Sequence, residues 1–132
     1  VSVKAFASSG RRLAVEAVPP SKTADAAARR REEGRALRAR LRPGYASVAL
    51  EVSGEPMDSA GFAKMLGRYK DAGKPVAFLV GGPHGIDRET ASACDRRLSL
   101  SPMTLPHELA ALVLAEQVYR AHAATGRRAY AK

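Results

Sequence analysis

The feature that most constrains the fold is the uninterrupted apolar run Val76–Val80, which lies between Pro75 and the glycine pair Gly81 and Gly82. The run has the length of a strand. A strand without polar alternation must be covered on both faces, as happens in parallel sheets flanked by helices. The run therefore predicts an α/β domain in which helices precede and follow this strand.

The segments on either side of this run alternate between strand and helix patterns. Each predicted helix carries a polar cap, a proline near its start or a glycine near its end. Further strands are predicted at Leu13–Ala17, Ala46–Val52 and Leu98–Ser101, and helices at Ser21–Leu41 (capped by Ser21 or Thr23), Met57–Lys74, Asp87–Arg97 (capped by Asp87) and Pro106–Gly126. This order predicts one three-layer α/β domain over residues 1–132, without a repeat or linker.

Positive charge is concentrated near the start of the chain. The net charge is +9, and residues 1–42 hold 11 basic and 4 acidic residues. Six arginines lie on the first predicted helix, namely Arg29, Arg30, Arg31, Arg35, Arg38 and Arg40. Such an excess favours a polyanionic partner such as nucleic acid over a merely solvated face.

The single cysteine, Cys94, excludes an internal disulfide and favours a reducing compartment. Its place in a predicted helix indicates a buried thiol rather than a nucleophile. No apolar run approaches the roughly 20 residues of a membrane span, and no signal-peptide pattern is present. We therefore expect a cytoplasmic protein without membrane contact.

The last predicted helix is apolar around most of its circumference. One face carries Leu109, Leu112 and Val113, and another carries Ala111, Leu114 and Val118. Such a helix must be buried on more than one side, and a chain of this length has little mass to cover it twice. The pattern favours a homodimer in which a second copy covers the other face.

Three loops follow the carboxyl ends of predicted strands, at Leu50–Glu55, Val80–Gly85 and Leu100–His107. In open α/β sheets such loops meet around a ligand, so they predict one pocket. The loops hold no acidic pair, no metal-ligand cluster and no nucleophile with a base. A pocket of this kind suits a cofactor that brings its own reactivity.

The remaining polar candidates have simpler interpretations. His84 and His107 are interpreted as hydrogen-bonding or exposed loop residues, and His107 also fits the first turn of the last helix. Glu116 and Arg120 stand four residues apart, which is the spacing of a helical ion pair. No metal site is predicted.

The stretches "LVGGPHGI", "LSLSPMTLPHELA" and "LAEQVYRA" together closely resemble the RlmH family (YbeA-like), ribosomal RNA large-subunit methyltransferases of the SPOUT class. The resemblance runs from about Leu13 to the C-terminus. It implies an α/β fold whose C-terminal part forms a deep trefoil knot, a homodimer, and S-adenosylmethionine as the methyl donor. It also implies methylation of N3 of a pseudouridine in helix 69 of 23S ribosomal RNA.

The resemblance also assigns site residues. The cofactor contacts of the family fall on Leu50, Gly81, Leu100, Ser101, Pro102, Met103, Thr104 and Leu105. In the tail "GRRAYAK", Tyr130 matches the family's tyrosine and Arg128 stands where many members have a histidine, so these two are the expected catalytic residues. Ala131 and Ala111 replace a usual histidine and a usual arginine. These departures concern catalysis and RNA positioning more than cofactor binding.

The segment before Leu13 is about twenty residues shorter than the strand and helix of the family, and we expect that the sequence omits a segment there. Two other functions stay open. One is a non-catalytic RNA-binding or ribosome-associated protein, which the altered tail suggests. The other is an α/β enzyme that uses a different nucleotide.

Overall fold

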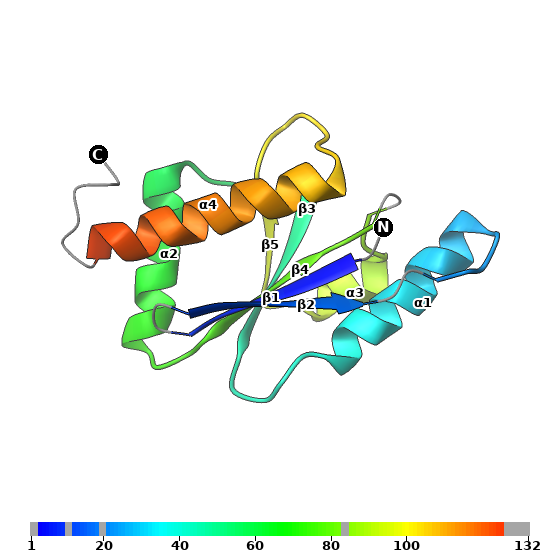
Figure 1. Ribbon diagram of the computed structural model, residues 1–132, viewed down its shortest axis with the longest axis horizontal. Helices are drawn as coiled ribbons and strands as arrows, with labels where there is room; N and C mark the ends of the chain where they lie inside the picture. The colour runs from blue at the N-terminus through cyan, green and yellow to red at the C-terminus, as the bar shows by residue number, and fades with distance from the viewer. Residues whose placement is uncertain (1–2, 10–11, 19–20, 83–84, 126–132) are drawn as a thin grey trace.

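The computed structural model describes residues 3–9, 12–18, 21–82 and 85–125 (Figure 1). Within this part of the chain, five strands form one sheet and four helices pack against it. The elements are β1 (Val3–Ser9), β2 (Arg12–Val18), α1 (Ala26–Ala39), β3 (Ala46–Pro56), α2 (Ser59–Asp71), β4 (Val76–Val80), α3 (Arg88–Ala93), β5 (Arg96–Ser99) and α4 (His107–Thr125).

The sheet has the order β2-β1-β4-β3-β5. Strand β3 runs parallel to both β4 and β5, whereas β1 is antiparallel to β2 and to β4. All five side chains of β4 are buried, so the predicted two-sided burial of Val76–Val80 is confirmed. The α/β class is confirmed with it. Strand β1 was not predicted, because a segment of alanines and serines around one phenylalanine has little strand pattern.

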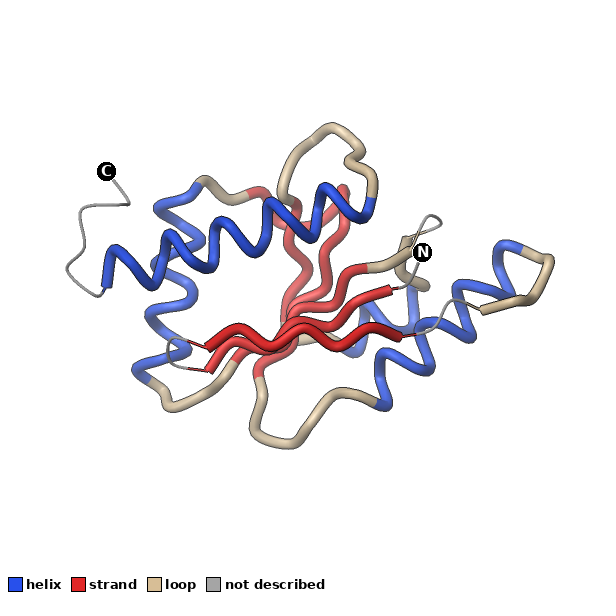
Figure 2. Tube along the Cα trace, viewed as in Figure 1, coloured by secondary structure: helices blue, strands red, loops and turns tan. Residues whose placement is uncertain are grey.

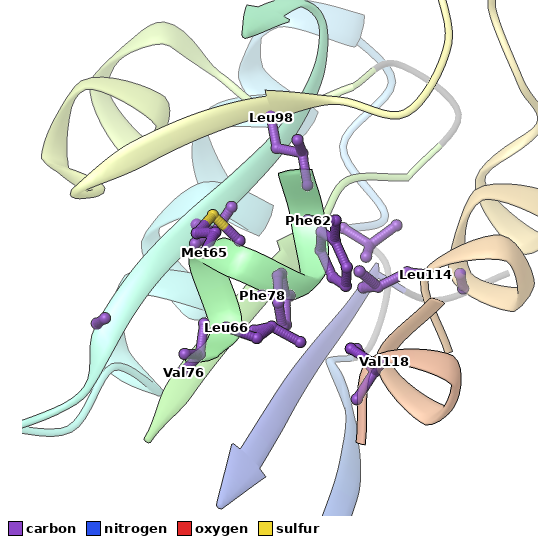
Figure 3. Packing of buried hydrophobic residues seen from close by; sticks show 13 residues of the cluster. Phe62, Met65, Leu66, Val76, Phe78, Leu98, Leu114 and Val118 are labelled. Carbon is purple, nitrogen blue, oxygen red and sulfur yellow. The ribbon is translucent and has the colours of Figure 1, made fainter. Parts of the chain in front are cut away.

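Successive residues of β3 and β4 point to opposite faces of the sheet and belong to two separate apolar clusters. Val48 and Phe78 join α2 and α4, and Figure 3 shows the side chains of that cluster around Phe78. The rings of Phe62 and Phe78 lie 5.8 Å apart. Ala49 and Leu79 instead join a second cluster with α1 and α3. The helices accordingly gather in two pairs, as Figure 2 shows.

Helix α1 begins later than the sequence indicated. Asp25 is its N-cap, and its carboxylate accepts the backbone N–H of Ala28 at 2.8 Å. The prediction that Ser21 or Thr23 caps the helix was therefore wrong. The hydroxyls of Ser21 and Thr23 instead donate hydrogen bonds to the Glu32 carboxylate, and these bonds lower the pKa of Glu32. Neither hydroxyl therefore bonds the first backbone N–H groups of the helix, as a cap would.

Helix α3 is capped by Asp87, as predicted, but it ends at Ala93 rather than at Arg97. Strand β5 starts at Arg96, two residues before the predicted Leu98–Ser101. Two reciprocal hydrogen bonds between Asp95 and Ser47 explain these bounds. The Asp95 carboxylate accepts the Ser47 N–H at 2.8 Å, and the Ser47 hydroxyl accepts the Asp95 N–H at 3.0 Å. The Asp95–Ser47 pair holds the chain beside β3, so α3 ends before Asp95 and β5 begins directly after it.

Among the described residues, no helix combines the length and the apolar character that crossing a membrane requires.

Candidate functional site

A cavity of about 760 Å³ lies at the carboxyl ends of β4 and β5 and beside residues 50–53 of β3, next to the start of α4. All three predicted loops contribute to its lining, so their meeting in one pocket is confirmed. Seven of the eight predicted cofactor contacts line it: Leu50, Gly81, Leu100, Ser101, Met103, Thr104 and Leu105. Pro102 is exposed and is not part of the lining. That these residues touch a cofactor stays a prediction.

The first wall is a bulge in β3. Leu98 of β5 pairs with Leu50 and again with Glu55, so the intervening residues of β3 leave the ladder. Val52 is half exposed there, and it lines the cavity with Glu51 and Ser53. Gly54 closes the bulge, since a Cβ on it would lie 2.8 Å from the backbone of Leu98. The bulge thus turns part of a strand into a pocket wall.

The second wall is the turn after β4. Gly82 and Gly85 form an isolated antiparallel bridge, and the Gly85 N–H donates to the Gly82 carbonyl at 3.0 Å. A Cβ on Gly81 would lie 2.5 Å from the carbonyl carbon of Gly85. Gly81 is one of the residues that the resemblance assigns to the cofactor. In the structure, the returning backbone of Gly85 takes the space of a Cβ at Gly81, so the glycine first shapes the wall.

The third wall is the loop between β5 and α4, which serine side chains organise. The Ser99 hydroxyl donates to the Ser101 carbonyl at 2.9 Å. The Ser101 hydroxyl in turn accepts the backbone N–H of Met103 at 2.9 Å. These local bonds bend the chain away from the strand direction and leave Met103 largely exposed at the rim of the cavity.

Two ionisable residues in the lining were not among the predicted contacts. Glu51 is half-buried in the β3 wall, and His107 is half-buried in the first turn of α4. The Nε2 atom of His107 is buried and has no hydrogen-bond partner among the described residues. A buried polar atom without a partner is costly, which makes this nitrogen ready to bond a ligand. The positions of Glu51 and His107 in the predicted loops were the sequence signal that could have identified them as lining residues.

The predicted tail residues Arg128 and Tyr130 lie outside the described residues, as do Ala131 and His84. Ala111 is buried in the apolar cluster of α4, so this position offers no polar group to the cavity. The predicted ion pair between Glu116 and Arg120 is confirmed at 3.0 Å. Cys94 is buried, and burial raises the pKa of its thiol, as expected for a structural cysteine.

The arginines of α1 are partly engaged within the protein. The Nε of Arg29 donates to the Thr23 carbonyl at 2.9 Å, and Arg38 donates to the Thr90 hydroxyl at 2.7 Å. Arg31 and Arg35 are exposed. In the described ranges, no three His, Cys, Asp or Glu side chains gather as metal ligands.

Comparison with known proteins places this geometry in a family. A family model described as a predicted SPOUT methyltransferase matches residues 4–130. Curated relatives named ribosomal RNA large subunit methyltransferase H are similar over most of the chain. The Alcanivorax borkumensis protein is 43% identical, with 83% of this chain and 73% of the relative covered. The Pseudomonas aeruginosa protein is also 43% identical, with 76% and 64% covered. The chain spans about two thirds of the length of most of these relatives.

Proposed function

Because the chain belongs to the SPOUT methyltransferase family and to its RlmH group, we propose that it methylates large-subunit ribosomal RNA with S-adenosylmethionine as the methyl donor. The observation that carries this proposal is the cavity beyond β3, β4 and β5, lined by seven of the eight residues that the family resemblance assigns to the cofactor. The names of the relatives supply the RNA substrate class.

The residues of the cavity fit this cofactor. The volume of about 760 Å³ lies within the range of about 300–1,000 Å³ typical of small-molecule pockets. Apolar side chains such as Leu50, Leu100 and Leu105 suit an adenine ring, while Glu51 and the unpartnered His107 Nε2 offer polar contacts. When bound, S-adenosylmethionine supplies an electrophilic methyl group on its sulfonium. The protein then has to hold this methyl in line with the attacking atom and exclude water.

For the target we propose N3 of a pseudouridine in helix 69 of 23S ribosomal RNA, on the basis of the family resemblance. This imide nitrogen must lose its proton before it attacks, so a base or a cation close to it assists the reaction. We assign these roles to the tail residues Tyr130 and Arg128. The net charge of +9 supports an RNA partner.

We also propose a homodimer and the knotted, three-layer fold of the family. On α4, Ala111, Leu114 and Val118 are buried, whereas Leu112 is 66% exposed and Leu109 is 43% exposed. A second apolar face on a helix needs a cover, and a copy of the same helix is the simplest one. The helix that closes the cofactor cavity would then also form the dimer contact.

Transfer of labelled methyl from S-adenosylmethionine to bacterial ribosomes that lack the modification tests the proposal. We expect transfer to these ribosomes and none to fully modified ones. Calorimetry with S-adenosylhomocysteine should give about one site per subunit. RNA binding without methyl transfer or cofactor binding would replace the proposal with the non-catalytic function. Displacement by adenine nucleotides would favour the enzyme that uses another nucleotide.

A further inference from the structure

A second cavity, of about 690 Å³, lies between α2, the end of β3 and the start of β5. We call it the α2 groove. Its lining is rich in cations and holds only two carboxylates, those of Glu55 and Asp58. The cations are Lys64, Arg68, Lys74 and Arg96. The family resemblance assigns nothing to these residues.

Both carboxylates of the α2 groove are already engaged. The Asp58 carboxylate is the N-cap of α2 and accepts the Gly61 N–H at 2.7 Å. The Glu55 carboxylate faces Arg96, with 3.6 Å between Oε1 and Nη1. No ion pair joins Lys64, Arg68 or Lys74 to another described residue, and all three are exposed. The groove therefore carries uncompensated positive charge.

The arrangement of these cations suits an extended anionic chain. Lys64 and Arg68 are one helical turn apart and so lie on one face of α2. Lys74 follows the end of the helix, beyond Gly73 with its φ of +71°. Tyr69, half-buried against the apolar core, also lines the groove. Cations beside an aromatic ring are the elements with which proteins hold phosphates and bases of unpaired RNA.

The α2 groove adjoins the cofactor cavity along one strand. Ser53 of β3 lines the cofactor cavity, and Glu55, two residues further on, lines the groove. Two residues of chain span at most about 7 Å, so the linings of the two cavities come within that distance of each other at Ser53 and Glu55. An RNA loop that presents a base to the first cavity can therefore also reach the second.

We propose that the α2 groove binds the phosphate backbone of the RNA substrate beside the nucleotide that is methylated, through Lys64, Arg68 and Lys74. This inference rests on the proposed function and adds an RNA site distinct from the arginines of α1. The contacts are electrostatic and independent of sequence, whereas the cofactor cavity supplies the alignment for chemistry.

The test compares two triple variants of the full chain with equal loss of charge. The groove variant carries Lys64→Gln, Arg68→Gln and Lys74→Gln. The control carries Lys22→Gln, Lys70→Gln and Arg88→Gln, which are exposed residues outside the groove. The readouts are affinity for large ribosomal subunits over a range of KCl concentrations, methyl transfer to the same subunits, and S-adenosylhomocysteine binding.

For the groove variant we expect subunit affinity to fall at least tenfold, with unchanged S-adenosylhomocysteine binding. The slope of log Kobs against log salt should become shallower by about 2, because each lost contact to single-stranded RNA removes about 0.7. The control variant should match the wild type. If both variants bind alike while the wild type methylates, the groove inference fails and the proposed function stands. If the wild type neither binds nor methylates the subunits, both fail.

Discussion

The backbone of Gly85 lies directly against Gly81, so that a Cβ built on Gly81 would be 2.5 Å from the Gly85 carbonyl carbon and 2.9 Å from Cγ1 of Ile86. This contact folds the chain after β4 back toward the strand. It determines the shape of one wall of the proposed cofactor cavity, since Gly81, Gly85 and Ile86 all line it.

Replacing Gly81 with alanine should therefore damage the cavity more than the fold. The methyl group has to displace the backbone of Gly85, which costs about 1–3 kcal/mol of stability as in other overpacked sites. We expect at least a tenfold loss of S-adenosylhomocysteine affinity by calorimetry. Gly67→Ala is the matched control, because a Cβ there meets nothing within 4 Å. Unchanged affinity in Gly81→Ala would remove this wall from the cofactor site.

The α1–α3 contact should not tolerate a side chain at Gly34. A Cβ at this position would lie 1.7 Å from Oδ1 of Asp87 and 2.4 Å from the Thr90 hydroxyl. Asp87 caps α3 and also lies 3.5 Å from Arg38, so it cannot move without losing both interactions. We expect Gly34→Ala to lower the free energy of unfolding by about 2–3 kcal/mol in urea titration. A stability equal to the wild type would contradict this packing.

His107 should hold the cofactor through its buried Nε2. The variant His107→Phe keeps a flat aromatic ring but removes this nitrogen, and we expect about a tenfold weaker affinity for S-adenosylhomocysteine, typical of losing one buried hydrogen bond. His107→Gln, which retains a polar end, should recover part of the affinity. Equal binding by all three proteins would show that Nε2 does not face the cofactor.

Cys94 should be unreactive in the folded protein. Burial raises the pKa of its thiol, so the thiol stays protonated at pH 7 to 8 while an exposed thiol begins to ionise. Because the folded pKa is raised, any contribution to stability is present at neutral pH and is lost as the pH rises past the pKa of the unfolded thiol. Iodoacetamide should alkylate the native protein far more slowly than the urea-unfolded protein. Similar rates would contradict the burial.

Leu112→Glu should separate the proposed dimer into monomers. Leu112 is 66% exposed on α4, on the face away from the buried Leu114 and Val118. A carboxylate at the centre of an apolar interface is strongly unfavourable without a partner. Sedimentation should show a folded monomer for this variant, and Ala60→Glu on the exposed side of α2 should leave the assembly unchanged. A monomeric wild type would instead overturn the dimer proposal.

Much of the architecture follows from local patterns that the sequence displays directly. The apolar run Val76–Val80 predicted the doubly covered strand, and the helix predicted at Met57–Lys74 contains α2. Asp87 was recognisable as a cap because a cap bonds within its own turn. The loops after the parallel strands predicted the cavity, and the family resemblance selected seven residues that line it.

Other features depended on contacts between distant segments, which local patterns do not encode. The Asp95–Ser47 pair set where α3 ends and β5 begins, and the Glu32 and Glu33 carboxylates drew Ser21 away from the role of a cap. The backbone of Gly85 folds back against Gly81, which explains why position 81 has no room for a side chain. Likewise, the α2 groove joins residues of α2 to Arg96 of β5, far apart in the chain. By itself, the sequence determined the family and the type of every strand and helix except β1, since these depend on periodicity and motif. Only the tertiary structure decided the element ends, the cavity walls and the second cavity, because each results from partners brought together by folding.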